Sequence, residues 1–197
     1  MTTTATMFTK PKPPNLEYPE LYEFPAFFTR YHSSSSPQNT QPNDTTWAHQ
    51  RSIWAAWVLS YCRAHKIWKL QLSDALETEL FYNRNLNRRF KQRDAAELLE
   101  YMVTEGDVEW EGVGKATAIV YWRKPEEWAN VIYEWIDSTG QKGSVLTLYE
   151  ISEGDLTRNQ EFHTIDPYVL RKALDFLVKR SLAQVFGANE EMGVKFF

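Results

Sequence analysis

The strongest constraint on the fold is an internal repeat, in which two segments 75 residues apart carry the same pattern of side chains. Residues 98–110 (LLEYMVTEGDVEW) align with residues 173–185 (ALDFLVKRSLAQV), and five consecutive positions match in character. Apolar residues recur at helical spacing in both segments, and each segment continues into two short strand-like runs. The repeat predicts two copies of one small folded unit rather than a single continuous core.

The first copy is predicted to contain a helix, a strand, two further helices and a hairpin. Apolar side chains at i, i+3, i+4, i+7 and i+8 indicate a helix over residues 47–65, and the alternating run 67–72 indicates a strand. We expect a short helix or turn over 79–91. A second stripe that begins at Ala95 predicts the third helix, and two strand-like runs around a Gly-containing turn predict the hairpin.

The second copy repeats this order. Pro125 suits the first position of a helix, and residues 144–151 (SVLTLYEI) read as a strand. Residues 153–161 are polar, and we expect them to be irregular or briefly helical. Asp166 followed by Pro167 is typical of a helix start, and the last two apolar runs predict a closing hairpin.

This element order is that of a winged helix, so the sequence predicts an α+β fold with two tandem winged-helix domains. Each domain is near the small end of the usual size range, and buried aromatic side chains would compensate for the small cores. The expected organisation is a disordered tail (1–16), an extended Pro/aromatic docking segment (17–31), a polar linker (32–46), and winged helices at 46–123 and 124–197.

The Pro/aromatic segment is the best functional candidate that the residues alone indicate. It lies outside both repeats, prolines pre-set an extended backbone in it, and large aromatic side chains are favoured interface anchors. The segment either packs on its own domain or binds another protein. The candidate partner-binding residues are Pro19, Leu21, Tyr22, Phe24, Pro25, Phe27 and Phe28.

Charge argues against nucleic acid as the principal partner. The chain has a formal charge of −4, and residues 94–106, in the helix that would enter a DNA groove, carry four acidic residues and no Lys or Arg. A winged-helix nucleic-acid-binding or transcription-associated factor remains the alternative. The basic run Arg84–Arg93 is either a solvated surface or a site for a phosphate, a lipid headgroup or an acidic partner.

No pattern of residues indicates catalysis, a metal or a cofactor. Cys62 and His65 share a helix face but lack a second ligand pair. Acidic residues near His163 come without a nucleophile motif or a glycine-rich phosphate loop. The single cysteine excludes an internal disulfide and fits a reducing, cytoplasmic setting. No apolar run approaches the ~20 residues that span a bilayer. Membrane contact is expected to be indirect and carried by partner subunits.

Five segments together resemble a known family. They are YEFPAFF (22–28), RKPEEW (123–128), TLYEISEGD (147–155), EFH (161–163) and GVKFF (193–197). In order and spacing they are similar to the small-subunit family of the ESCRT-II complex. The resemblance implies tandem winged helices without catalytic activity, and two copies of the chain in a complex with two larger subunits on the endosomal surface.

The resemblance also implies two binding functions. Paired Pro-Pro-x-aromatic motifs dock the family's first winged helix on the larger subunits. Here Pro19, Leu21 and Tyr22 match one motif and Pro25, Phe27 and Phe28 the other, with Glu20 and Ala26 in place of the second prolines. The family's second winged helix recruits the first helix of an ESCRT-III subunit during sorting of ubiquitinated cargo into multivesicular endosomes.

The residues themselves suggest one surface for the second binding function. A basic amphipathic helix would suit an acidic rim, and Glu150, Glu153 and Asp155 supply three carboxylates beside the run 144–151. We therefore predict that these three residues contact the ESCRT-III helix.

Overall fold

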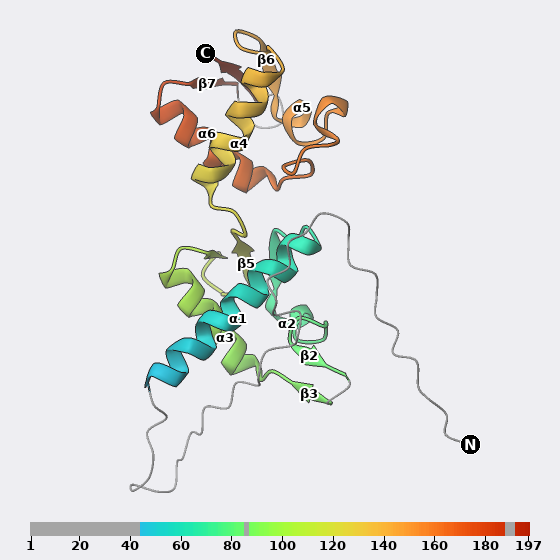
Figure 1. The fold of residues 1–197 in the computed structure, drawn as a ribbon, viewed down its shortest axis with the longest axis vertical. Helices are drawn as coiled ribbons and strands as arrows, with labels where there is room; N and C mark the ends of the chain where they lie inside the picture. Colours follow the sequence, from blue (N-terminus) through green and yellow to red (C-terminus); the bar gives the residue numbers. More distant parts are fainter. Residues whose placement is uncertain (1–43, 85–86, 188–191) are drawn as a thin grey trace, which may run out of the picture.

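The computed structural model describes residues 44–84, 87–187 and 192–197 (Figure 1). The first unit consists of α1 (Asp44–Ala64), β1 (Lys69–Gln71), α2 (Leu72–Ala75), β2 (Tyr82–Asn83), β3 (Arg88–Arg89), α3 (Gln92–Thr104), β4 (Val108–Glu111) and β5 (Thr117–Val120). The second unit consists of α4 (Pro125–Ser138), β6 (Val145–Thr147), α5 (Leu148–Ser152), the 3-10 helix η1 (Asp155–Thr157), α6 (Pro167–Lys179), β7 (Ala183–Phe186) and β8 (Gly193–Phe196).

The repeat seen in the sequence is a structural repeat, and the predicted α+β fold is confirmed. Helices α3 and α6 have 13 residues each and begin 75 positions apart, at Gln92 and Pro167. Strands β4 and β7 keep the same offset, since they begin at Val108 and Ala183. Each unit closes with an antiparallel three-stranded sheet of equivalent order, β1-β5-β4 in the first and β6-β8-β7 in the second.

The region between the first strand and the third helix differs from the prediction in the first unit. We expected a short helix or turn over 79–91; the single-turn helix α2 lies earlier, and residues 79–91 contain turn residues and the antiparallel hairpin of β2 and β3. Asn87, with φ of 48°, occupies the left-handed region in the turn of this hairpin, a conformation that Asn tolerates better than most residues. Turn chemistry therefore overrides the expected helix.

Two other predicted bounds are corrected. Helix α1 begins at Asp44, inside the expected linker 32–46; Asp and Thr favour the first turn of a helix, which explains the early start. The expected strand 144–151 divides after Thr147 into β6 and α5. The helix start at Asp166–Pro167 is confirmed, with the Asp166 carboxylate accepting from the Tyr168 backbone N–H.

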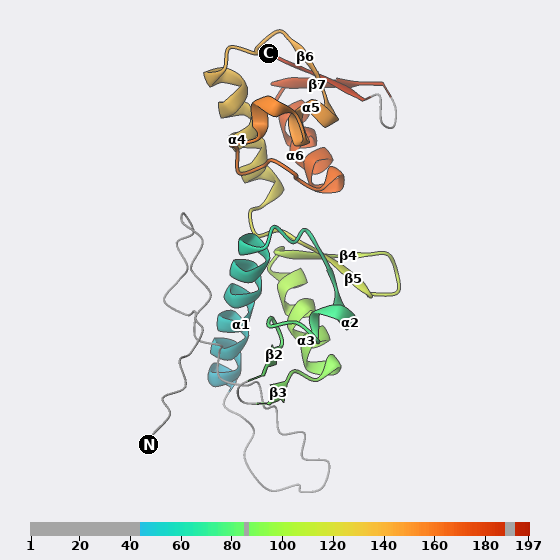
Figure 2. The same cartoon turned by 90° about the vertical axis from the view of Figure 1, so that its right-hand side faces the viewer.

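Two apolar clusters form the cores. The first is built mainly from α1 and α3 and includes fully buried Trp54 and Leu99. The second is built from α4, α6 and the segment between α5 and α6. The second cluster extends beyond the second unit, because it includes Trp68, Ile119 and Tyr121, which precede α4 in the sequence. The units stack end to end, and β2–β3 and the start of α1 lie at the end of the first unit remote from the second (Figures 1 and 2).

Candidate interaction surfaces

The predicted docking residues Pro19, Leu21, Tyr22, Phe24, Pro25, Phe27 and Phe28 lie outside the described residues. The described chain begins at Asp44, at the end of the first unit remote from the second (Figure 1).

A groove of about 610 Å³ lies between α5 and the first turns of α6. Its volume is in the range of ligand-binding clefts. The lining residues are Leu148, Tyr149, Ser152, Glu153, Ile165, Pro167, Leu170 and Arg171. Apolar side chains predominate, Tyr149 is 67% exposed, and Glu153 and Arg171 add charges of opposite sign. An apolar groove with charged residues is suited to an amphipathic helix.

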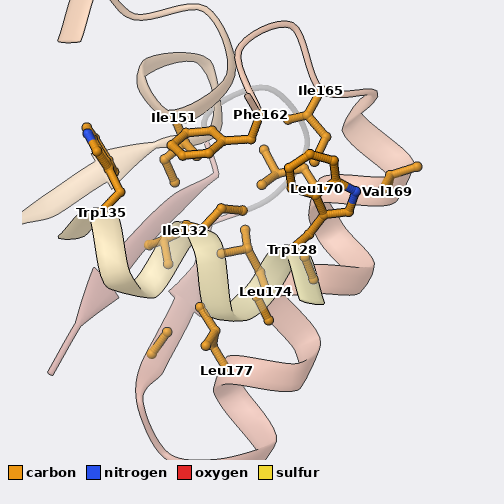
Figure 3. Close-up of a cluster of buried hydrophobic side chains, with 14 of the residues drawn as sticks. Trp128, Ile132, Trp135, Ile151, Phe162, Ile165, Val169, Leu170, Leu174 and Leu177 are labelled. Carbon is orange, nitrogen blue, oxygen red and sulfur yellow. The ribbon is translucent and has the colours of Figure 1, made fainter. Parts of the chain in front are cut away.

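Local capping interactions position both walls of this groove. Thr147 and Glu150 form a capping box at the start of α5, in which the Thr147 backbone N–H donates to Glu150 Oε2 at 2.7 Å. The opposite wall begins at the Asp166 N-cap. Behind it, Leu170 and Leu174 on α6 pack against Trp128 and Ile132 on α4 within the second core (Figure 3). The groove is therefore attached to a rigid helix pair.

The three predicted carboxylates have different environments. Glu153 lines the groove. Glu150 accepts hydrogen bonds from the Thr147 backbone N–H and hydroxyl, and the backbone hydrogen bond lowers its pKa below the ordinary value. Asp155 pairs with Arg158 at 2.7 Å on the exposed surface. Contact of all three with a partner helix remains a prediction, and only Glu153 among them borders the groove.

The acidic and histidine residues that could imitate a hydrolase site do not assemble into one. Glu161 pairs with Arg63 and Arg123, while His163 Nδ1 lies 3.1 Å from the Thr157 hydroxyl. Within the part of the chain that the structure describes, no group of three or more His, Cys, Asp or Glu residues is placed to hold a metal ion. Burial raises the pKa of the Cys62 thiol to about 12, which keeps it protonated and unreactive.

In the basic run Arg84–Arg93, Arg84 follows β2, Arg88 and Arg89 form β3, and the run ends in the first turn of α3. Arg89 is already engaged, because it pairs with Glu77 and lies 4.8 Å from the centroid of the Tyr82 ring. Arg84, Lys91 and Arg93 are exposed. This basic end coincides with the end where residues 1–43 join the first unit (Figure 2).

The third helices are poorly arranged for binding DNA. On α6 and its C-cap, Lys172 pairs with Glu109 and Arg180 pairs with Glu126, so both of these basic side chains are neutralised by neighbours. On α3, Glu100 accepts from Lys115 and from the Trp110 indole. Phosphate contacts need a dense basic face, and the structure therefore disfavours the nucleic-acid alternative.

Sequence reasoning missed two sets of contacts between the two units. One set is centred on Glu109 and the other on Glu161. Glu109 accepts from the hydroxyls of Tyr121 and Tyr168 and from Lys172. These residues are far apart in the sequence and follow no local motif, so no periodicity could have revealed them.

None of the described helices combines the length and apolar character needed to cross a bilayer.

The comparisons with known proteins agree in one family. The family model described as "ESCRT-II complex subunit" matches residues 21–166. The chain is 38% identical to vacuolar protein-sorting-associated protein 25 of Xenopus laevis, across 92% of this chain and 98% of that protein. It is 37% identical to the Homo sapiens protein of the same name, across 93% and 98% of the two chains.

Solved structures show the same likeness in the fold. The crystal structure of subunit VPS25 of the endosomal trafficking complex ESCRT-II matches with a TM-score of 0.70 and 27% identity, over 80% of this chain and 91% of that one. A chain in the crystal structure of the ESCRT-II complex VPS22/VPS25/VPS36 matches with a TM-score of 0.69 and 28% identity, over 79% and 91%.

Proposed function

Because this chain belongs to the family of ESCRT-II complex subunits, we propose that it is a non-catalytic adaptor that links the larger subunits of that complex to an ESCRT-III subunit. The observation that carries the proposal is the similarity to vacuolar protein-sorting-associated protein 25 along nearly the whole length of both chains. The adaptor works in the cytoplasm and reaches the endosomal membrane through its complex.

The first part of the proposal is docking through the N-terminal segment. Two copies of the chain join two larger subunits; that the similar protein VPS25 occurs in a complex with VPS22 and VPS36 supports the presence of two further subunits. The aromatic side chains of residues 22–28 fill pockets on those subunits, and the prolines reduce the entropy lost on binding. Exposed Arg84, Lys91 and Arg93 on the same unit suit an acidic surface of a larger subunit.

The second part is recruitment through the groove of the second unit. An amphipathic helix from the ESCRT-III subunit places its apolar face on Leu148, Tyr149 and Pro167, with basic side chains directed to Glu153. Two copies of the chain present two such grooves, which raises the effective local concentration of the recruited subunits. The outcome is sorting of ubiquitinated cargo into multivesicular bodies.

Docking is tested by co-purification with the two larger subunits, with stoichiometry measured by mass. Phe27→Ala combined with Phe28→Ala should abolish assembly while cooperative unfolding is retained. Phe8→Ala removes an aromatic side chain from the tail 1–16 and is the matched control. If the double variant assembled normally but lost thermal stability, the segment would be shown to pack on its own domain.

Recruitment is tested by titrating the chain with the first helix of the ESCRT-III subunit. Tyr149→Ala and Glu153→Lys should each weaken binding roughly tenfold or more, because one removes an exposed anchor and the other reverses the groove charge. Leu156→Ala is the control, since Leu156 is 74% exposed but does not line the groove. Equal binding by all three variants would place the site elsewhere.

A further inference from the structure

Three tryptophans from both units pack together where the units meet, and we call them the tryptophan triad: Trp68, Trp122 and Trp128. The ring centroids of Trp68 and Trp122 are 4.4 Å apart, and Trp128 on α4 lies 5.6 and 5.0 Å from them. No indole N–H of the triad has a hydrogen-bond acceptor among the described residues. Ring packing alone therefore holds the triad, and it is continuous with the second core.

Glu109 on β4 is the first of two carboxylates that tie the units together. The Tyr121 hydroxyl donates to it at 2.8 Å from the same unit, and the Tyr168 hydroxyl donates at 2.6 Å from α6. Lys172, one turn further along α6, completes the set as an ion pair. Because Tyr168 and Lys172 are i and i+4 on one helix, they fix the rotation of α6 as well as its position.

Glu161 is the second carboxylate. Here the acceptor belongs to the second unit and a donor to the first, whereas Glu109 lies in the first unit and accepts from the second. It lies between η1 and α6 and accepts from Arg63 of α1 at 2.8 Å. Arg123, which precedes α4, donates to its other oxygen at 2.6 Å and lies 5.1 Å from the centroid of Trp128. Lys66 adds a hydrogen bond to the His163 carbonyl at 3.2 Å.

The connection between the units is also short, since only residues 121–124 separate β5 from α4. Domains joined by a linker usually move relative to each other unless the interface is large and apolar. Here an aromatic cluster and two multiply bonded carboxylates oppose that motion.

We infer that Glu109 and Glu161 are positioning residues that hold the second unit in one orientation on the first, so that the chain is a rigid arm. The groove wall formed by Pro167, Leu170 and Arg171 belongs to the same turns of α6 that Glu109 holds. The junction thus sets the direction in which the groove points. This inference concerns the chain alone and stands whether or not the proposed partners are correct.

Pulsed electron–electron distance measurements on the full chain test the inference. One spin-label pair crosses the junction (Gln92→Cys with Asp175→Cys), and a control pair lies within the second unit (Glu134→Cys with Asp175→Cys); all three positions are exposed. Buried Cys62 stays unlabelled. We expect distance distributions of equal width for the two pairs in the otherwise unchanged chain.

Glu109→Gln combined with Glu161→Gln should widen the distribution across the junction roughly twofold and leave the control pair unchanged. Glu126→Gln removes an ion pair within the second unit and is the matched control. If the double variant does not fold, Tyr168→Phe with Lys172→Met removes the donors that α6 presents to Glu109 and must also widen the distribution across the junction. A broad distribution in the unchanged chain, or a narrow one in every variant, would overturn the inference.

Discussion

The two units share one element order, yet their third helices serve different contacts. On α6, Tyr168 and Lys172 bind Glu109 of the first unit. The equivalent positions 75 residues earlier, on α3, are Arg93 and Glu97, in the half of the helix that follows the β2–β3 hairpin. One scaffold position therefore joins the units in the second copy and follows the basic hairpin in the first.

The segment after the second helix differs in the same way. In the second unit α5 leads into η1 and leaves a groove against α6. In the first unit α2 leads into the basic hairpin β2–β3. Small insertions and side-chain changes have thus given two copies of one fold different surfaces, a basic hairpin in the first unit and an apolar groove in the second.

Trp128 allows the sharpest test of whether the two units are independent. It is fully buried in the second core and belongs to the triad. Trp128→Ala should destabilise the chain by about 3–5 kcal/mol, the usual cost of truncating a buried tryptophan. Trp54→Ala, at an equally buried site of the first core, should cost about as much but leave the junction intact.

Urea unfolding followed by circular dichroism measures both variants. If the chain is a rigid arm, each variant should show one cooperative transition, because loss of either core removes the support of the other. Two separate transitions in Trp128→Ala, with the first unit melting at its unchanged urea concentration, would show that the units are independent domains.

Glu109 links the comparison to pH. Burial raises the pKa of Glu109, but hydrogen bonds from Lys172, Tyr168 and Tyr121 outweigh burial and bring it below the ordinary value of 4.5. A lowered folded-state pKa means that the carboxylate stabilises the fold above pH 4.5 and loses this effect as the pH falls through its folded-state pKa. Glu109→Gln should therefore cost about 1–2 kcal/mol near neutral pH, less at high salt.

The check is the free energy of unfolding of both proteins from pH 7 to pH 3. The difference between them should be constant down to about pH 4.5 and then shrink as Glu109 becomes protonated. Glu111 lies on the same strand as Glu109 and forms an exposed ion pair with Lys69 of β1. Glu111→Gln should therefore change the free energy of unfolding much less. A gap that widened on acidification would contradict the assignment.

Much of the fold could be predicted because it is encoded locally. The apolar stripes in α3 and α6 are short-range patterns, and so is the Asp166–Pro167 helix start. The repeat supported the same helices in both units, and the structure confirms them. The β2–β3 hairpin was missed because a Gly-free turn with Asn87 at positive φ leaves a weak signal.

The contacts between the units could not be predicted, because they join residues far apart in the sequence, from 38 positions for Arg123 and Glu161 to 98 for Arg63 and Glu161, that follow no period. Glu109 and Lys172, or Arg63 and Glu161, look like ordinary surface charges in the sequence. Only the fold brings them together. One groove residue, Glu153, had been selected from the sequence. Leu148 and Tyr149, which also line the groove, had been assigned to a strand and lie in α5.

The capping box of α5 supplies the smallest expected effect and separates structure from recognition in the second unit. Thr147-x-x-Glu150 is a sequence signature of a helix start that the alternating run 144–151 concealed. Thr147→Ala should cost about 1 kcal/mol, whereas Thr147→Ser, which keeps the hydroxyl, should cost little.

Glu150 caps α5 rather than borders the groove, so Glu150→Gln should lower the thermal midpoint and leave the affinity for the partner helix unchanged. Glu153→Gln should lower that affinity and leave the thermal midpoint unchanged. Thermal melts and titrations of these variants decide the point, and a loss of affinity in Glu150→Gln at full helix content would restore that carboxylate to the binding surface.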